Sequence, residues 1–339
     1  MKSHRLHAQA THRWEEDVKA LTTVLVLVAA VLAPAGAEAQ DKVDTLKLAI
    51  GQRGNWENAP AELGQEAGIF RKHGIVLESL YTSGGGETMQ AVLSGSVDVG
   101  MGVGTGGILS AFFKGAPVRA IGNSTTGARD LYWYVPAGSE IQSMKDAGGR
   151  TIAFSTNGSS TNTTALGLIE TFKVDAKPVA TGNPSSTFTQ VMSGQVDIGW
   201  ASPPFGVEAV QQGKIRIIAR GDDVPALRDQ TVRLMITSAP TLDAKADAIK
   251  RFAEAYSETL DWMYSDPAAV AAYAKWVDVP ISVAEDVREE FYPKENLRLD
   301  RLSGLDAAMQ SAIDMKFLSA SLSQEQLDEL FQYQAGPVK

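Results

Sequence analysis

The chain has 339 residues, of which 44% are hydrophobic and 21% are charged, and its formal net charge is −9. This length and composition predict a folded protein of about two domains and exclude a disordered chain. The acidic balance argues against nucleic acid or an anionic membrane as a partner, because both require a cationic face. The chain has no cysteine, which excludes disulfides, thiolate metal sites, thiol nucleophiles and a lipid-modified cysteine.

The N-terminal segment has the pattern of an export signal. An apolar run over residues 21–32 follows Lys19 and precedes Ala37-Glu38-Ala39, the small-x-small pattern that signal peptidase cleaves. The run is too short for a membrane anchor, which needs about 20 apolar residues. We therefore expect a signal peptide at residues 1–39, cleavage near Ala39, and a periplasmic protein without a lipid anchor.

Strands and helices are predicted to alternate along the next part of the chain. Hydrophobic periodicity predicts strands at 45–52, 76–81, 97–103 and 118–124, and helices at 58–73, 87–94 and 108–114. These elements make a first α/β lobe over residues 45–127.

A second set of alternating elements predicts lobe two at residues 128–229. Its strands are expected at 131–135, 150–155, 177–181, 196–200 and 215–219, and its helices at 160–172, 187–193 and 205–212. A strand at 232–237 and helices at 243–266, 267–277, 282–292, 302–316 and 323–333 then return to lobe one, which takes in residues 230–339. A chain that leaves lobe one and returns makes a hinge of two crossings, which permits closure on a ligand.

Two segments of the chain nearly repeat each other. Residues 92–100 (VLSGSVDVG) and 191–199 (VMSGQVDIG) each predict the end of a helix, a Ser-Gly turn and a strand. Such a repeat indicates two similar lobes with a cleft between them. Asp98 and Asp197 occupy the same place in the two repeats, so we expect them to fix the local turn through backbone hydrogen bonds rather than to bind a metal.

Few residues are left for catalysis once the leader is removed. His73 is then the one remaining histidine, and its position in a basic stretch before Gly74 predicts the end of a helix, where a cation meets the negative end of the dipole. A histidine-rich metal site is excluded, and the chain has no Walker loop. We expect no catalytic residue, no metal and no cofactor.

Several motifs resemble one family of transport proteins. They are residues 68–78 (GIFRKHGIVLE), 84–87 (GGGE), 93–100 (LSGSVDVG), 149–154 (GRTIAF) and 155–161 (STNGSST). Together they resemble the nitrate/sulfonate/taurine-type periplasmic solute-binding proteins of ABC importers and the related thiamine-pyrimidine-precursor-binding proteins, over nearly all of the chain after Thr45. The resemblance implies an α/β, two-lobed periplasmic-binding-protein fold of type II (Venus flytrap), with a hinge of two crossings and C-terminal packing helices. It also implies a monomer that delivers a small solute to an ABC permease in the inner membrane.

The residues themselves predict a cleft for such a solute. Ligands of open α/β sheets bind outside the carboxyl ends of the strands, and here those ends carry small hydroxyl, amide and glycine residues. Two of the loops open helices at Gly86 and Ser160, where free N–H groups and the helix dipole favour an anion. Arg53 is the one cation in these loops, and Trp56 and Trp200 are expected to form apolar walls. The predicted ligand-binding residues are Arg53, Asn55, Trp56, Ser83, Gly84, Gly85, Thr105, Asn123, Ser124, Thr156, Ser159, Ser160, Thr161, Trp200 and Ser202.

These observations predict a non-enzymatic solute-binding protein. The expected solute is a small organic anion, such as a sulfonate, a taurine-like compound or a carboxylate, or else nitrate. One alternative is a neutral heteroaromatic such as a thiamine pyrimidine precursor. A second is an enzyme on the same fold, as in the pyrimidine-synthase relatives, but those enzymes rely on cysteine and histidine residues, and the mature chain has no cysteine and one histidine. A third is a sensor that presents its closed form to a receptor.

Overall fold

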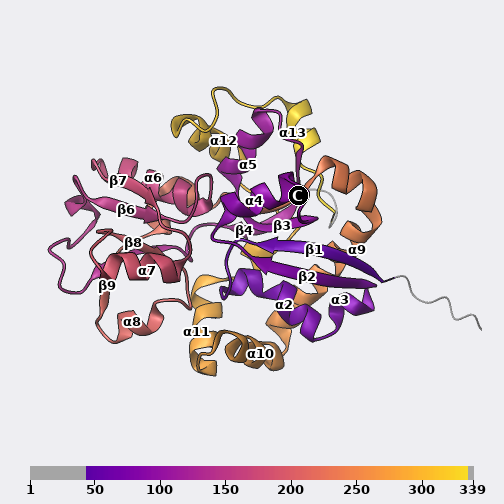
Figure 1. The fold of residues 1–339 in the computed structure, drawn as a ribbon, viewed down its shortest axis with the longest axis horizontal. Coiled ribbons are helices and arrows are strands. Elements are labelled where there is room, and N and C mark those ends of the chain that lie inside the picture. Colours follow the sequence, from indigo (N-terminus) through magenta and orange to yellow (C-terminus); the bar gives the residue numbers. More distant parts are fainter. Residues whose placement is uncertain (1–42, 335–339) are drawn as a thin grey trace, which may run out of the picture. The chain divides into compact units, whose positions relative to one another are not determined.

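The computed structural model describes residues 43–334, and the predicted export signal lies outside the described residues. The larger of the described sheets belongs to lobe one (Figure 1). Its strands, in order across the sheet, are β2 (Ile75–Tyr81), β1 (Asp44–Ile50), β3 (Val99–Gly104), β10 (Thr231–Ser238) and β4 (Val118–Thr126). β1 is parallel to β2 and β3, whereas β10 is antiparallel to both of its neighbours. A strand from late in the sequence therefore lies between two early ones.

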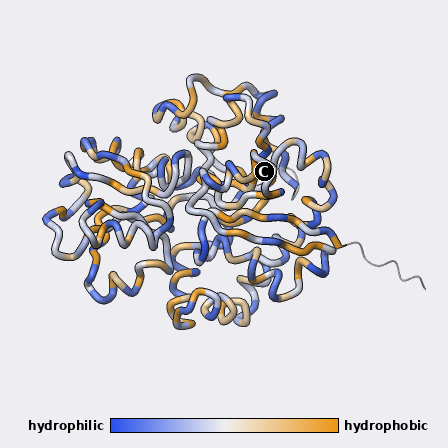
Figure 2. Tube along the Cα trace, in the orientation of Figure 1, coloured by the Kyte–Doolittle hydropathy of each residue, from blue (hydrophilic) through white to orange (hydrophobic). Residues whose placement is uncertain are grey.

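Helices pack on both faces of this sheet (Figure 1). The core on one face includes residues of α2 (Ala59–Glu66), α3 (Ile69–Lys72), α9 (Ala239–Ser265), α10 (Pro267–Val277) and α11 (Ile281–Phe291). The core on the other face includes residues of α4 (Gly85–Leu93), α5 (Thr105–Phe113), α12 (Leu305–Asp314) and α13 (Gln324–Leu330). Leu46, Leu48 and Ile50 of β1 join the first of these cores and Ala49 joins the second, as the alternation of side chains along a strand requires. The hydrophobic residues of β1 and β2 stand out in Figure 2.

Lobe two has its own sheets and its own core. A three-stranded antiparallel sheet has the order β8 (Gly199–Ala201), β5 (Tyr132–Pro136) and β9 (Ile215–Arg220), and β6 (Thr151–Phe154) pairs in parallel with β7 (Lys177–Ala180). A bridge between Ile152 and Ile198 links the two sheets. Its helices are α6 (Ser160–Phe172), α7 (Pro184–Met192) and α8 (Val207–Gln211). The fold is thus the predicted two-lobed α/β fold, and we keep the predicted boundaries as names for the lobes.

Short 3-10 helices occupy several of the connections. They are η1 (Trp56–Asn58), η2 (Met144–Asp146), η3 (Gly221–Asp223), η4 (Pro225–Leu227) and η5 (Lys294–Leu297). Among the described residues, no helix is both long enough and apolar enough to cross a membrane.

The two crossings between the lobes lie side by side. Gly127, after β4, donates its backbone N–H to the carbonyl oxygen of Gln230, before β10, over 2.9 Å. Gly127 has a φ of +82°, and a Cβ there would lie 2.8 Å from the carbonyl oxygen of Arg228. A glycine is therefore needed for the close approach of the two chains, which is the arrangement of a two-stranded hinge.

The single helix predicted at residues 58–73 is wrong. The structure has η1, α2 and α3 in this segment, with α2 ending at Glu66 and α3 beginning at Ile69. Gly68 lies between α2 and α3 with a φ of +77°, a left-handed conformation that ends one helix before the next begins.

The predicted backbone hydrogen bonds of the repeated aspartates are confirmed, but they are not made to the local turn. Asp98 accepts the backbone N–H of Lys47 in β1 over 2.9 Å, and Asp197 accepts the backbone N–H of Thr151 in β6 over 2.8 Å. Each carboxylate therefore holds the start of its own strand to a neighbouring strand.

The repeat extends into the loops before α4 and α7. Thr82 and Thr88 join through their hydroxyl oxygens at 2.7 Å, and Thr181 and Thr187 do the same at 2.6 Å. The two lobes thus share a strand–loop–helix–strand unit, and the hydrogen bond between its two threonine hydroxyls occurs in both.

Gly64→Ala should destabilise lobe one, although alanine favours a helix over glycine. A Cβ at Gly64 would lie 2.3 Å from Oγ1 of Thr259 and 2.8 Å from the ring of Phe70, so α2 and α9 must separate. We expect a loss of about 1–3 kcal/mol in the free energy of unfolding, measured with urea. Gly148→Ala is the control, because a Cβ there meets nothing within 4 Å. An equal effect of the two substitutions would contradict this packing argument.

Candidate functional site

A small cavity lies between the lobes, at the ends of β1 and β3. Its volume is about 30 Å³, and since one water needs about 10–15 Å³, it holds about two water molecules. It is lined by Gly51, Gln52, Asn55, Glu57, Asn58, Gly84, Gly85, Gly102 and Arg233 of lobe one and by Asp130, Leu131, Ser155, Ser159, Ser160, Thr161 and Trp200 of lobe two. Both lobes therefore contribute polar groups to the same cavity.

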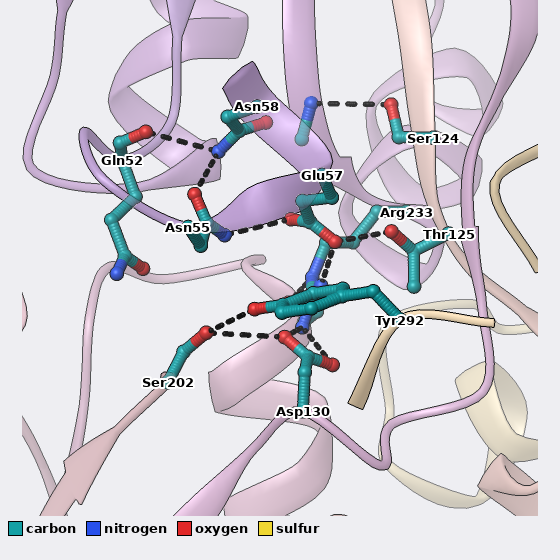
Figure 3. Close-up of polar contacts among 12 residues, drawn as sticks. Gln52, Asn55, Glu57, Asn58, Ser124, Thr125, Asp130, Ser202, Arg233 and Tyr292 are labelled. Atoms are coloured by element: carbon teal, nitrogen blue, oxygen red, sulfur yellow. Dashed lines mark hydrogen bonds and ion pairs between the residues drawn. The ribbon is translucent and has the colours of Figure 1, made fainter. Parts of the chain in front are cut away.

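A buried arginine is the centre of the polar network at this cavity (Figure 3). Arg233, from β10, forms ion pairs with Glu57 in η1 and with Asp130 in the crossing after β4, the latter at 2.9 Å. Its Nε donates to the hydroxyl of Ser160 at the start of α6, over 2.8 Å. The exposed fractions of Glu57, Asp130 and Arg233 are 2%, 1% and 4%. One guanidinium thus joins lobe one, a crossing and lobe two.

Further hydrogen bonds tie this network to the surrounding elements. Asp130 accepts the hydroxyl of Ser202, which also contacts the hydroxyl of Tyr292 at 3.0 Å (Figure 3). Glu57 accepts the hydroxyl of Thr125. The C-terminal helices therefore take part in positioning the site.

Burial and neighbouring charges shift the pKa values in opposite ways. Burial raises the pKa of Glu57, and the nearby Asp130 raises it further, against the opposing effect of Arg233. Burial alone would lower the pKa of Arg233, but the two carboxylates outweigh it, so the pKa is raised and the guanidinium stays charged. The network therefore holds a permanent cation beside a carboxylate that resists ionisation.

A chain of side-chain amides fixes the orientation of Asn58 (Figure 3). Asn58 Nδ2 donates to the carbonyl oxygen of Gln52 at 3.0 Å and to Oδ1 of Asn55 at 2.8 Å. Asn55 Nδ2 in turn donates to Glu57 over 3.2 Å. Because the Gln52 carbonyl can only accept, the amide of Asn58 cannot be flipped, and its Oδ1 is left buried without a partner in residues 43–334.

Trp200 has an unpaired hydrogen-bond donor, whereas Asn58 has an unpaired acceptor. It lies in β8, is 2% exposed and lines the cavity, and its Nε1 has no acceptor among the described residues. Gly85 and Ser160, the first residues of α4 and α6, line the same cavity. Free backbone N–H groups at helix starts carry partial positive charge. The cavity thus offers a fixed acceptor at Asn58 and donors at Trp200 and the two helix starts.

The lobes meet through glycines next to the cavity. A Cβ added at Gly104 or Gly107 would lie 2.6 or 2.3 Å from the carbonyl oxygen of Gly158 in lobe two. A Cβ at Gly86 would lie 2.3 Å from the carbonyl oxygen of Asn157. Lobe one therefore approaches the loop before α6 more closely than any side chain permits.

The structure brings part of the predicted site together. The predicted residues that line the cavity are Asn55, Gly84, Gly85, Ser159, Ser160, Thr161 and Trp200. The predicted residues outside its lining are Arg53, Trp56, Ser83, Thr105, Asn123, Ser124, Thr156 and Ser202.

Arg53 and Trp56 have structural contacts of their own. Arg53 is exposed, lies 4.8 Å over the ring of Trp276 and donates to the carbonyl oxygen of that residue. Trp56 is fully buried, and its Nε1 donates to the hydroxyl of Tyr264. The cation at the cavity is therefore Arg233, where the sequence had indicated Arg53.

The other predicted residues outside the lining support the site from behind. Ser83 lies beside Glu87, which accepts its backbone N–H, and Thr156 accepts the N–H of Gly86 across the lobes. Thr105 donates to the carbonyl oxygen of Thr231, and Ser124 accepts the N–H of Gly102. Asn123 donates to the carbonyl oxygens of Asn296 in η5 and of Arg298 directly after it.

Sequence reasoning missed Gln52, Glu57, Asn58, Asp130 and Arg233, which all line the cavity. One signal was available for Arg233, because an arginine inside the apolar strand Thr231–Ser238 indicates a buried ion pair. No comparable local signal marks Glu57 or Asp130, whose partner comes from a distant part of the sequence.

The remaining histidine lies away from the cavity. His73 follows α3, at the predicted end of a helix, and its Nε2 contacts Glu258 of α9 at 2.8 Å. Within residues 43–334, no group of three or more histidine, cysteine or acidic residues is placed to hold a metal ion.

Comparison with known families identifies the chain. The model of the family described as NMT1/THI5 like matches residues 55–270, a range that includes Glu57, Asp130 and Arg233. This chain belongs to the NMT1/THI5-like family. Comparison with curated proteins gives no match.

Solved structures show the same fold as this NMT1/THI5-like protein. The alkanesulfonate-binding protein SsuA of Xanthomonas axonopodis pv. citri, bound to MOPS, has a TM-score of 0.67 at 18% identity, over 80% of this chain and 90% of that one. The aliphatic sulphonate-binding protein SsuA of Escherichia coli has a TM-score of 0.62 at 18% identity, over 83% and 91%. The nitrate-binding protein NrtA of Synechocystis PCC 6803 has a TM-score of 0.65 at 14% identity, over 86% of each chain. The predicted family relationship and the periplasmic-binding-protein fold are confirmed.

Gly107→Ala should weaken solute binding by preventing full closure of the lobes. Alanine favours α5 by about 1 kcal/mol over glycine, so the helix itself tolerates the change, but the new methyl group meets Gly158 of lobe two. We expect a loss of affinity of at least about tenfold, measured by calorimetry. Gly106→Ala in the same helix is the control, because its nearest contact is a side-chain atom at 3.3 Å. Unchanged affinity in Gly107→Ala would contradict a closure role for this contact.

The raised pKa of Glu57 predicts a pH-dependent stability difference. A group whose folded-state pKa is raised contributes stability that is complete below its unfolded value, near 4.5, and is lost as the pH rises through the folded-state pKa. As the pH is lowered from neutral, the melting temperature of the wild type should therefore rise relative to that of Glu57→Gln.

Asp197→Asn is a control for which we expect the opposite pH dependence of stability. Burial opposes the ionisation of Asp197, but hydrogen bonds from Thr151 outweigh it and lower the pKa. The wild type should therefore lose stability relative to Asp197→Asn as the pH falls. Parallel trends in the two variants would contradict the environment assigned to Glu57.

Proposed function

We propose that this protein is the extracytoplasmic solute-binding component of an ABC importer, which captures a small solute between its lobes and delivers it to a permease in the inner membrane. The observation that carries the proposal is the cavity lined by both lobes, in which Asn58 and Trp200 keep polar atoms without a partner in residues 43–334. Buried polar groups are nearly always paired in folded proteins, so a solute held there would complete the hydrogen bonds of both residues.

The proposed solute carries an acidic group such as a sulfonate, taurine-like or carboxylate group, or is nitrate. The starts of α4 and α6 support an anion at the cavity, and the buried Nε1–H of Trp200 is a donor for one of its oxygens. The binding of sulfonates and nitrate by proteins of the same fold adds support.

A neutral heteroaromatic such as a thiamine pyrimidine precursor is the second candidate. The observation in its favour is that the cavity has an unpaired acceptor at Asn58 and an unpaired donor at Trp200, which suits a ring that carries both a donor and an acceptor.

The proposal is for binding without catalysis. The chain has no cysteine, and His73 is paired with Glu258 outside the cavity lining. The remaining parts of the proposal, export to the periplasm by a cleavable leader and action as a monomer, rest on the N-terminal pattern and on the family resemblance.

Purified protein from the periplasm should be stabilised by members of one solute class. A thermal-shift screen would compare alkanesulfonates, taurine, nitrate, carboxylates and pyrimidines. A ligand at a hundred times its dissociation constant adds about 2.7 kcal/mol to stability, a shift of several degrees. Failure of every class to shift the melting temperature would contradict the proposed function.

Trp200→Phe should weaken the ligand found in that screen by about tenfold, because a buried hydrogen bond to the solute is lost. Trp262→Phe is the matched control, since Trp262 lies in α9 and its Nε1 donates to Asp266, directly after that helix and outside the cavity lining. Calorimetry on both variants measures the difference. Equal affinities of the two variants would show that Trp200 does not bind the solute.

A further inference from the structure

The residue that follows α11 joins the two lobes. α11 packs in the core of lobe one through Ala284 and Val287, and Tyr292 comes directly after its last turn. The Tyr292 hydroxyl lies 3.0 Å from the hydroxyl of Ser202 in lobe two (Figure 3). It also donates to the carbonyl oxygen of Pro203 over 3.2 Å. One side chain of lobe one therefore makes two polar contacts with the segment after β8.

Lobe one holds this hydroxyl in place. Tyr292 is 1% exposed, and its backbone carbonyl oxygen accepts the hydroxyl of Tyr264 in α9. The Tyr264 hydroxyl in turn accepts the Nε1–H of Trp56 over 3.0 Å. A side chain that its own lobe already fixes loses little conformational entropy when it bonds to a second surface. The Tyr292 hydroxyl is therefore preorganised to bond to lobe two.

Two further contacts join the lobes outside the cavity lining. The guanidinium of Arg220 in β9 lies 5.9 Å over the ring of Phe291, the last residue of α11. Val207 of α8 packs against the core of lobe one. Cation–π and apolar contacts thus accompany the hydrogen bonds of Tyr292.

The solute cavity takes no part in these contacts. Tyr292, Ser202 and Pro203 all lie outside its lining. Their hydrogen bonds form when the lobes close, with or without a solute, and are exchanged for bonds to water when the lobes separate. A contact that exists only in the closed form raises the ratio of closed to open protein.

We infer that Tyr292 is a latch residue, whose hydroxyl stabilises the closed form independently of the solute, so that the empty protein is already partly closed. This role goes beyond the proposed function, because it concerns the protein without a solute. Where only the closed form binds tightly, the apparent affinity scales with the closed fraction. The latch therefore raises the affinity for every solute by a common factor and leaves the choice between solutes to the cavity.

Distances between spin labels on the two lobes measure the ratio of closed to open protein. The chain has no cysteine, so Ser96→Cys and Gln195→Cys, at matching exposed positions of the two repeats, place one label on each lobe. The protein is first freed of solute by unfolding and refolding. We expect a closed and an open distance in the wild type, and in Tyr292→Phe a closed-to-open ratio that is lower by about two- to tenfold, the net value of one hydrogen bond.

Tyr273→Phe is the matched control. The Tyr273 hydroxyl is buried and donates to the carbonyl oxygen of Gly54 over 2.7 Å, and both residues belong to lobe one. The control therefore loses an equivalent hydrogen bond, and the melting temperatures of the two variants should fall by similar amounts. Its closed-to-open ratio should stay at the wild-type value.

Three outcomes would overturn the latch. They are a single open distance in the solute-free wild type, an unchanged ratio in Tyr292→Phe, and an equal fall of the ratio in Tyr273→Phe. Each of them leaves the proposed function standing, because no solute enters the measurement. Failure of the proposed function would instead appear in the thermal-shift screen, as a melting temperature that no solute class changes.

Discussion

The burial of the Arg233 guanidinium between two carboxylates is the interaction on which the site depends. Arg233 lies in β10, the strand that returns from lobe two and enters the first sheet between β3 and β4. Its partners come from η1, from the crossing and from the start of α6. Removing one partner of such a pair leaves a buried charge uncompensated, which costs about 3–5 kcal/mol. The same contacts therefore hold the lobes together and set the electrostatics of the cavity.

Closure depends on the absence of side chains at a few positions. The repeated strand–loop–helix unit gives each lobe a helix start near the cleft, and glycines in lobe one let the loop before α6 approach the backbone directly. Backbone contacts of this kind leave little free volume, so the cavity is small and its polar atoms are shielded from water. Shielding strengthens every interaction with a bound solute and makes each unpaired group costly.

The pattern of unpaired atoms describes the solute more closely than the fold does. Proteins of this fold bind sulfonates and nitrate, at identities too low to carry a ligand from one to another. In this chain, an oriented amide oxygen, an indole N–H and a guanidinium buried between two carboxylates lie around one space.

The sequence by itself determined the order of strands and helices, the two-lobed repeat and the family, because these follow from local periodicity, turn residues and motifs. It also predicted that Asp98 and Asp197 bond to the backbone and that Ser160 and Trp200 lie at the cleft, since Ser160 begins a predicted helix and Trp200 ends a predicted strand. Only the tertiary structure decided which cation serves the site. Arg53 and Arg233 are equally charged, but Arg53 stacks on Trp276 at the surface, whereas the insertion of β10 between β3 and β4 buries Arg233. That choice depends on contacts between distant segments, which no local pattern encodes.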